Sequence, residues 1–416
     1  MKFPHRVVVT GLGAVTPLGI SAEESWKNAL AGQSGIAPIT RFPADTYEVR
    51  IAGEVKNFDS SLYIEKKEQK KMDQFIHYAV GATKMALDHS GLDPQGSWRE
   101  KAGVLIGAGM GGLPAIEEQH SRMLEKGPGR ISPFFIPMVI GNMAAGQVSI
   151  QFGLHGPNYA LTSACASGAH SIGEAYRYLR EGSWDVMIAG GAESTICGMA
   201  LGGFGAMRAL STRNEEPTRA SRPYDQDRDG FVIAEGAGIL ILETLEHALK
   251  RGAPILAEVV GYGMSADAYH MTNPAPEGAG AARAMTYALK DAGLNPEQIQ
   301  YINTHGTSTP VGDELETLGI KSVFKEYAKK GLWVSSTKSM MGHALGAAGA
   351  IESVFCVQAL RDQAVPPTIN LENPSPACDL DYVAKESRQG KLQYVLNNSF
   401  GFGGTNACLI FSRFSN

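Results

Sequence analysis

Residues 79–94, AVGATKMALDHSGLDP, are repeated further along the chain as residues 281–296, AARAMTYALKDAGLNP. Both copies have the apolar spacing of an amphipathic helix, and in both a glycine and then a proline end that helix. The residues that recur at one constant offset are Ala79, Ala82, Ala86, Leu87, Gly91, Leu92 and Pro94. One such match is compatible with a generic helix ending. A second match, between VVVTGLG near residue 10 and EVVGYG near residue 260, makes an internal duplication the better interpretation.

Each half of the chain is predicted to be an α/β unit. Short apolar runs bounded by glycine alternate with helix-like segments, which is typical of buried strands connected by helices. The runs are RVVVTG, AGVLIGAG, DVMIAGG, GILILE, ILAEVVGYG, QYINTHG, LWVSSTK, YVLNNSFG and ACLIFS. The seam between the halves is predicted near residues 251–257, which divides the chain into residues 1–253 and 254–416. A site formed between two such halves would draw residues from both.

The composition limits the classes of protein that the chain can represent. A length of 416 residues exceeds what one hydrophobic core usually supports, and 44% hydrophobic with 19% charged residues is typical of a soluble globular protein. A net charge of −5 gives no general reason to expect a nucleic-acid partner. No uncharged apolar stretch reaches membrane-spanning length, and the start MKFPHRVVVTGLG lacks the apolar core of a signal peptide. We therefore expect a cytoplasmic protein that binds neither nucleic acid nor membrane.

The five cysteines are scattered and odd in number, so a disulfide framework is not expected and a reducing compartment is favoured. The sequence has no CxxC pair, so a thiolate zinc site is not expected either. Four cysteines are interpreted as buried small hydrophobic residues: Cys197, Cys356, Cys378 and Cys408.

The fifth cysteine, Cys165, has different surroundings. It follows the predicted strand YALTS, its neighbours are small, and apolar positions at helical spacing begin directly after it. A thiol at a helix N-terminus meets free backbone amides and the positive end of the helix dipole, which stabilise a thiolate. The amide of Cys165 itself could also bind an oxyanion. We therefore interpret Cys165 as a nucleophile.

Two strands in the second half end in polar side chains. The run QYINTHG brings His305 to a glycine turn, followed by Thr307, Thr309 and an acidic helix start. The run LWVSSTK ends at Lys338 and leads through a turn to His343, ahead of a small-residue helix. Two histidines in one half that face a thiol in the other would form a three-point site. The remaining histidines are expected to be ordinary core or surface residues: His5, His77, His89, His120, His155, His170, His247 and His270.

Four motifs in this order resemble those of the β-ketoacyl-[acyl-carrier-protein] synthases, and the likeness covers essentially the whole chain. TSACASGAH is similar to the nucleophile motif of that family, and NTHGTSTPVGD to its first histidine motif. TKSMMGH is similar to its lysine and second histidine motif, and NSFGFGGTN to its C-terminal loop. The resemblance implies a thiolase fold, in which two duplicated αβα halves form a five-layer αβαβα arrangement, and a homodimer. It is strongest to the elongating type II enzymes of bacterial fatty-acid synthesis.

The resemblance also implies an activity and the residues that carry it. Cys165 would accept the acyl group, His305 and His343 would act on the malonyl group, and Lys338 would support the histidines, with Glu352 in the lysine network. The reaction would be a decarboxylative condensation with malonyl-[acyl-carrier-protein], giving a 3-oxoacyl product two carbons longer. A thiolate suits this reaction because its acyl intermediate has an energy comparable to that of the substrate thioester. Two neutral imidazoles can donate N–H groups to the enolate.

Other positions match the family less specifically. Phe402 would gate the site, and its amide, with that of Cys165, would bind the acyl oxyanion. Thr307 and Thr309 would form hydrogen bonds with the phosphopantetheine arm that carries the substrates, and neither a metal nor another cofactor is implied. The acyl-pocket walls, which are equally compatible with an ordinary core, would include Met110, Phe135 and Phe204.

The implied partner is an acyl carrier protein, which is acidic. The run EKKEQKKMD begins a basic segment with Lys66, although a lysine run is equally compatible with a solvated helix face. A basic rim on a net-acidic enzyme would favour an anionic protein partner. The rim would include Lys67, Lys70, Lys71, Arg130 and Arg208.

Other interpretations are weighed against this one. A nicotinamide dehydrogenase is suggested by GxG in VVVTGLGAVTPLG, but Thr16 stands where a third glycine is needed, and Pro17 follows it. A non-catalytic carrier-binding protein is disfavoured because Cys165 and both histidines are present. A type I synthase or a stand-alone polyketide ketosynthase would use the same chemistry, and the shape of the acyl pocket decides between them.

Overall fold

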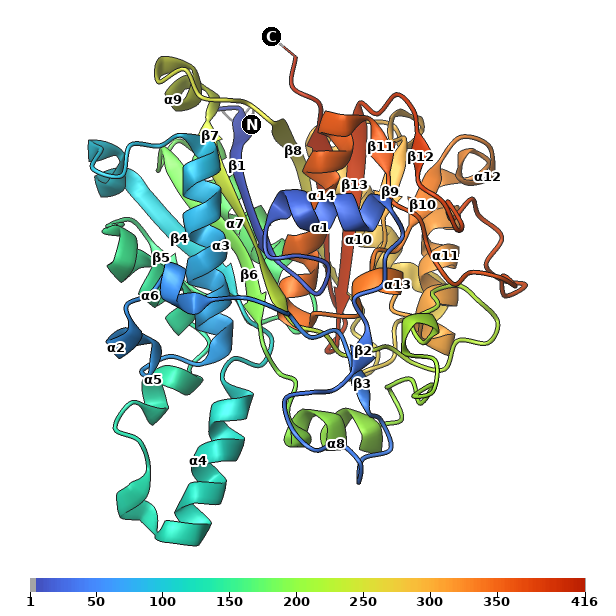
Figure 1. The fold of residues 1–416 in the computed structure, drawn as a ribbon. Coiled ribbons are helices and arrows are strands. Elements are labelled where there is room, and N and C mark those ends of the chain that lie inside the picture. The colour runs from blue at the N-terminus through green and yellow to red at the C-terminus, as the bar shows by residue number, and fades with distance from the viewer. Residues whose placement is uncertain (1–4, 416) are drawn as a thin grey trace.

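A large mixed β-sheet runs through the centre of the molecule (Figure 1). The computed structural model describes residues 5–415, and ten strands of that part form this sheet in the order β10-β9-β13-β14-β8-β1-β7-β6-β4-β5. The strands are β1 (Val7–Val15), β4 (Ala102–Gly107), β5 (Asn158–Tyr159), β6 (Val186–Glu193), β7 (Gly236–Thr244), β8 (Ala257–Ala266), β9 (Tyr301–Asn303), β10 (Trp333–Ser335), β13 (Tyr394–Gly401) and β14 (Thr405–Ser412). Two small hairpin-like sheets pair β2 (Ala37–Pro38) with β3 (Ile51–Ala52) and β11 (Ala364–Val365) with β12 (Arg388–Gln389).

Helices cover both faces of the large sheet and connect its strands (Figure 1). The longer ones are α1 (Ala22–Leu30), α3 (Gln74–Ser90), α4 (Leu113–Lys126), α6 (Met143–Phe152), α7 (Ser167–Arg180), α8 (Gly198–Ala206), α10 (Ala279–Ala292), α11 (Pro310–Phe324) and α14 (Ala348–Asp362). The shorter ones are α2 (Lys66–Gln69), α5 (Phe135–Val139), α9 (Leu245–Lys250), α12 (Tyr327–Lys330) and α13 (Lys338–Met341). None of the helices described in residues 5–415 combines the length and apolar character needed to cross a membrane.

The ten strands divide into two equivalent sets of five. From the middle outward, β1-β7-β6-β4-β5 belongs to the first half of the chain and β8-β14-β13-β9-β10 to the second. In each set the two inner pairings are antiparallel and the two outer pairings are parallel. Each set also has a register shift at the same place, one residue before Gly11 and one residue before Gly261. The internal duplication predicted from the sequence is therefore a duplication of structure.

The helices complete five layers. α7 and α14 lie against each other in the middle, and both contact strands of both half-sheets. α3 and α6 cover the outer face of the first half-sheet, and α10, with α11 packed beside it, covers that of the second. This arrangement confirms the predicted αβαβα thiolase-type fold.

Close packing explains why the repeated segments kept the same glycines and alanines. A methyl group on Gly11 would lie 2.2 Å from the carbonyl oxygen of Ala86 on α3, and one on Gly261 would lie 2.5 Å from that of Ala288 on α10. Two residues later, a methyl group on Gly13 would clash with the carbonyl oxygen of Ala82, and one on Gly263 would clash with that of Ala284. Helix and strand backbones can approach this closely only without a side chain between them. The GxG of the first repeat thus packs inside β1 against a helix, which disfavours the dinucleotide-binding interpretation.

Substitution of Gly263 by alanine is expected to destabilise the fold by about 3 kcal/mol, because the added methyl group would lie 2.1 Å from Ala284 O in a closely packed layer. Urea unfolding, followed by circular dichroism, measures the loss. Gly202→Ala is the matched control, since a methyl group there meets no atom within 4 Å. Equal unfolding midpoints for the two variants would contradict this account of the repeat.

Most predicted elements are present, and one is shorter than expected. The nine apolar runs form nine strands, whereas YALTS contributes only Tyr159, the last residue of β5, because the chain turns before Cys165, with Ala164 in the left-handed region at φ 49°. The four cysteines predicted to be structural are buried. The predicted boundary between residues 253 and 254 falls in the connection from α9 to β8 and stays a prediction.

Candidate active site

Cys165 lies in a tight turn between β5 and α7. The turn is fixed by Ser167, whose Oγ accepts from the amide of Ser163 at 2.9 Å and donates to the carbonyl of Ala164 at 2.7 Å. Ser167 is the first residue of α7, so the thiol stands at the N-terminus of a central helix, as the sequence predicts. The turn directs the side chain away from the helix bundle and into a cavity.

This cavity has a volume of about 810 Å³ and is shared by the two halves of the chain. Apolar residues of α8 and its surroundings form one part of the lining, and the loops after β9 and β13 form another. The predicted site residues that line it are Cys165, His305, His343, Met110, Phe204, Thr307, Thr309 and Phe402. Phe135, predicted as a pocket wall, is not among the lining residues; it begins α5, on the projection formed by α4 and α5.

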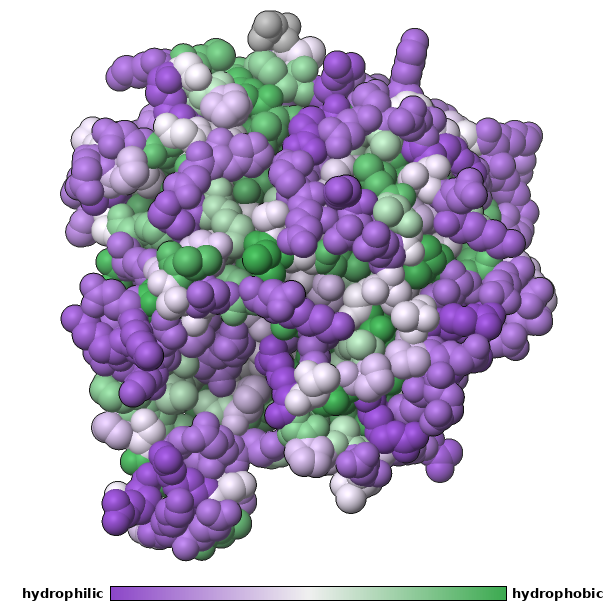
Figure 2. Space-filling view, in the orientation of Figure 1, coloured by the Kyte–Doolittle hydropathy of each residue, from purple (hydrophilic) through white to green (hydrophobic). Residues whose placement is uncertain are grey.

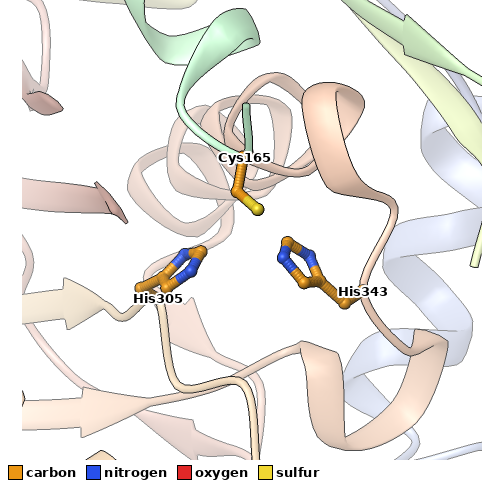
Figure 3. Close-up of side chains that lie close together, drawn as sticks. All are labelled: Cys165, His305 and His343. Atoms are coloured by element: carbon orange, nitrogen blue, oxygen red, sulfur yellow. The ribbon is translucent and has the colours of Figure 1, made fainter. Parts of the chain in front are cut away.

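The thiol and the two imidazoles converge at one point of this cavity (Figure 3). The sulfur of Cys165 and one ring nitrogen each of His305 and His343 lie within 4.8 Å of one another. The two imidazole rings meet edge to face, with centroids 5.3 Å apart. The three-point site predicted from strand ends of both halves is therefore present.

The backbone at His305 is held by the carboxylate of Glu316, a residue that the sequence analysis did not identify. Glu316 on α11 accepts hydrogen bonds from the backbone N–H groups of His305 at 2.9 Å and Gly306 at 2.7 Å. Asn398 donates to the same carboxylate at 3.1 Å, and the ring of Phe400 packs 5.8 Å from the imidazole. The spacing of Asp313 and Glu316 on one face of a predicted helix was the signal that could have revealed this residue.

His343 is held by the other half of the chain. Its amide donates to the carbonyl of Val232 at 2.8 Å, and its carbonyl accepts from the amide of Ala234 at 2.9 Å. The ring of Phe231 packs against the imidazole with centroids 5.4 Å apart. A segment of the first half thus positions a histidine of the second.

Lys338 and Glu352 form a buried ion pair behind the histidines. Both side chains are almost fully excluded from solvent, and the ammonium group donates to the carboxylate. Burial lowers the pKa of His305 and of His343 well below the usual value, and the charge of Lys338 lowers both further. Both imidazoles are therefore neutral at physiological pH.

The neutral histidines lead to a pH prediction. The malonyl decarboxylation that the family resemblance implies is expected, in a Cys165→Gln variant, to show no loss of rate between pH 8 and about pH 6, the range in which an unperturbed histidine would become charged. The sign follows from the lowered pKa values, because the N–H donors stay neutral until the solution is more acidic. Release of CO₂ at a series of pH values tests this, and an inflection near pH 6.5 would contradict it.

The protonation state of Cys165 departs from the sequence-based expectation. Burial raises the pKa of the thiol to about 12, and the charge of Glu193 adds to this rise. The charge of Lys338 and the backbone N–H groups of Phe402 and Cys165 lower the pKa, but they do not offset the loss of hydration. The expectation of a stabilised resting thiolate is therefore wrong, and Cys165 is a thiol at neutral pH.

The residues of the predicted basic rim are exposed except Lys71, which is half-buried, and two of them have acidic partners. Lys67 pairs with Glu65 at 3.0 Å, and Lys71 pairs with Glu68 at 2.8 Å. Three members of the rim have no ion pair within residues 5–415: Lys70, Arg130 and Arg208. Arg208 also lines the cavity, whereas Arg130 lies on the projection formed by α4 and α5.

Comparison with known proteins identifies the family. Residues 5–248 match the profile of the β-ketoacyl synthase N-terminal domain, and residues 256–372 match that of the C-terminal domain. The chain belongs to the β-ketoacyl synthase family. It is 53% identical over 410 residues to 3-oxoacyl-[acyl-carrier-protein] synthase 2 of Vibrio cholerae, an alignment that covers 98% of this chain and 99% of the relative. It is also 52% identical over 409 residues to the protein of the same name from Coxiella burnetii, again with 98% and 99% covered.

Solved structures of ketosynthases have the same fold. A β-ketoacyl synthase from Burkholderia phymatum superposes with a TM-score of 0.92 at 37% identity, over 99% of this chain and all of the other. A type II polyketide ketosynthase, solved with its acyl-carrier protein, superposes with a TM-score of 0.92 at 36% identity and the same coverage.

This β-ketoacyl synthase is therefore a condensing enzyme of the acyltransferase class. Its relatives at about half identity support the elongating condensation of fatty-acid synthesis, as the sequence predicts. Neither a polyketide ketosynthase nor a dehydrogenase is favoured by these relationships.

Proposed function

We propose that Cys165 is the acyl-accepting nucleophile and that His305 and His343 stabilise the enolate formed from a malonyl thioester. The observation that supports this most directly is the convergence of the sulfur and both imidazoles within 4.8 Å in one cavity. The substrates would be acyl and malonyl groups carried on acyl carrier protein, and the product would be a 3-oxoacyl group two carbons longer.

In the first step, the sulfur of Cys165 attacks the thioester carbonyl of the acyl substrate. A carbon–sulfur bond forms, the bond to the carrier thiol breaks, and the departing thiol takes the proton of Cys165. The raised pKa of Cys165 means that this proton leaves during the attack rather than before it. The amides of Cys165 and Phe402 lie beside the sulfur, where they would donate to the oxyanion.

In the second step, the malonyl group loses CO₂, and the electron pair of the broken carbon–carbon bond becomes an enolate. The neutral imidazoles of His305 and His343 donate N–H groups to the enolate oxygen, and one such donor typically contributes about 3 kcal/mol. The enolate carbon then attacks the acyl-cysteine carbonyl, and Cys165 leaves as a thiolate that regains a proton. Holding both reactants in one cavity makes carbon–carbon bond formation effectively unimolecular.

Access to the site would run past the loop after β13. Phe402, which is 37% exposed, stands at that loop beside two glycines with positive φ, which allow the backbone to move. The hydroxyl groups of Thr307 and Thr309 lie 3.0 Å apart in the cavity lining, so both can reach the polar groups of a pantetheine arm. No metal would be needed, because the ammonium group of Lys338 beside the histidines disfavours a second cation there.

The carrier protein would dock at the basic rim that ends at Arg208, since an acidic partner is attracted to exposed positive charge. A homodimer is supported by two features of the first half. The outer edge of β5 has no partner strand within residues 5–415. Exposed apolar side chains lie on and beside α4, α5 and α6: Leu124, Phe134, Ile136, Ile140 and Ile150. Figure 2 shows the surface coloured by hydropathy, with hydrophobic residues among hydrophilic ones on its lower left.

The test is incubation with an acyl-carrier-protein thioester and then with malonyl-carrier protein, followed by mass analysis of peptides and products. We expect an acyl adduct confined to the peptide that contains Cys165, and its conversion to a 3-oxoacyl product two carbons longer. An adduct on any other cysteine, or elongation without an adduct, would overturn the assignment.

A further inference from the structure

The carboxylate of Glu193 is fully buried at the end of β6 and is not used in the proposed reaction. Its Oε2 atom accepts from the amides of Gly109 at 2.7 Å and Gly346 at 3.0 Å. Its Oε1 atom accepts from the amides of Met110 and Gly111, both at 3.1 Å. Four backbone N–H groups directed at one carboxylate form the kind of surroundings that bind an anion.

This carboxylate connects two walls of the catalytic cavity. Residues 109–111 follow β4 in the first half of the chain, Gly346 precedes α14 in the second half, and Gly109, Met110 and Leu345 line the cavity around Cys165. The segments at Gly109 and Gly346 are closely packed, because a methyl group on Gly346 would lie 2.2 Å from Gly109 N and 2.7 Å from Glu193 Oε2. Glu193 thus determines how these two segments meet.

The internal duplication shows which part of the first site corresponds to the surroundings of Glu193. The turn before α7 and the turn before α14 are equivalent, with Ala164 at φ 49° and Leu345 at φ 46°, so Gly346 occupies the position of Cys165. The strand registers are equivalent as well: β6 pairs with β7 as β13 pairs with β14. This register places Glu193, paired with Gly236, at the position that Gly401 has in the second half, where it pairs with Thr405.

The two equivalent positions differ in what occupies them. Beside Cys165, Gly401 has no side chain, and the amide of Cys165 is free to receive a substrate oxygen. Beside Gly346, a carboxylate oxygen of Glu193 already accepts from the equivalent amide. We propose that Glu193 is a positioning residue that fills the second, unused oxyanion position of the duplicated fold and so sets the wall of the acyl cavity at Met110.

The same carboxylate places negative charge near the nucleophile. Burial raises the pKa of Glu193 to about 7, against the lowering effect of its four N–H donors, so it is ionised in alkaline solution. Its charge is one of the influences that raise the pKa of Cys165. The other groups facing the thiol are the ammonium group of Lys338 and the neutral imidazoles of His305 and His343, and none of these is altered when Glu193 is changed.

Two variants test these roles: Glu193→Gln loses the charge together with hydrogen bonds, because its amide nitrogen cannot accept from a backbone N–H group, whereas Glu193→Asp keeps the charge and alters only the hydrogen bonds. Glu193→Gln removes the charge, so alkylation of Cys165 by iodoacetamide is expected to be about three- to tenfold faster than in the wild type at pH 9, with the difference vanishing below about pH 6, where Glu193 is protonated. Glu193→Asp keeps the charge but is one methylene shorter, so its alkylation rate should follow the wild type. Both variants should change the ratio of kcat/KM for long and short acyl substrates by about tenfold, because the wall at Met110 relaxes.

Glu243→Gln is the matched control, because Glu243 is an equally buried carboxylate, held by Arg251 outside the cavity. It should leave the alkylation profile and the chain-length ratio unchanged even if its melting temperature falls. The proposal is overturned if Glu193→Asp keeps the wild-type chain-length ratio, if Glu193→Gln keeps the wild-type alkylation rate at pH 9, or if the control reproduces either effect. If the Glu193→Gln variant does not fold, the ratio of kcat/KM for long and short acyl substrates in the Glu193→Asp variant tests the proposal.

The chain-length measurement rests on the proposed function, whereas alkylation does not. If wild-type Cys165 is never acylated by the carrier substrate, the proposed function fails, and the alkylation profile still reports on Glu193. If the wild type elongates normally and the variants match it, Glu193 is only a structural residue.

Discussion

Replacement of Cys165 by alanine is expected to abolish condensation, with a loss of about a thousandfold or more in the rate of 3-oxoacyl product formation. The reason is that no other thiol lines the cavity within the described residues, so the acyl group has nowhere to be held. Product formation from acyl- and malonyl-carrier protein, measured by mass spectrometry, tests the prediction.

Two further variants make this prediction specific. Cys165→Gln should lose condensation but retain malonyl decarboxylation, because His305, His343 and Lys338 are unchanged and the amide side chain resembles an acylated cysteine. Cys378→Ala removes another buried thiol outside the cavity and should keep elongation within about twofold of the wild type. Normal elongation by either Cys165 variant would refute the mechanism.

The second large effect is expected at the histidines. In the Cys165→Gln background, His343→Ala should slow decarboxylation by about a hundred- to a thousandfold, because one N–H donor to the enolate oxygen is lost. His305→Ala should have an effect of the same size. The rate of CO₂ release from malonyl-carrier protein measures both changes.

Acyl transfer separates a catalytic role of the histidines from a structural one. With Cys165 intact, the His343→Ala variant should still form the acyl adduct, since the main-chain hydrogen bonds of residue 343 to Val232 and Ala234 do not depend on the imidazole. His155→Ala serves as the control for both measurements, because His155 is an exposed histidine that does not line the cavity. Decarboxylation that is unaffected by both histidine substitutions would show that the enolate is stabilised elsewhere.

Local patterns in the sequence predicted most of the fold. The repeat at residues 79–94 and 281–296 revealed the duplication because it reflects a local requirement, in which a helix of small residues lies directly on a glycine-containing strand. The nine apolar runs became nine strands because each is short, β-rich and bounded by glycine. YALTS failed as a strand because its last residues enter the turn that presents Cys165.

Local patterns did not predict the residues that hold the two histidines in place. Glu316 acts through the backbone of His305, and Phe231 packs on His343 from the opposite half of the chain. The spacing of Asp313 and Glu316 could have indicated a buried acidic face on that helix, but no local pattern indicates which backbone Glu316 holds or that Phe231 packs on His343. Phe135 does not line the cavity within one chain and begins α5 on the α4–α5 projection, so its place in the acyl pocket stays a prediction.

The sequence by itself determined the duplicated α/β halves, the cysteine at the start of a central helix and the two histidines at strand ends, because each depends on a short stretch of chain. Only the tertiary structure decided the protonation of Cys165 and the role of Glu193. The thiol is neutral because the surrounding fold removes water from it, and Glu193 acts through amides that lie 84 and 153 residues away in the chain. Burial and contacts at such separations arise from how the two halves pack together, and no local pattern encodes them.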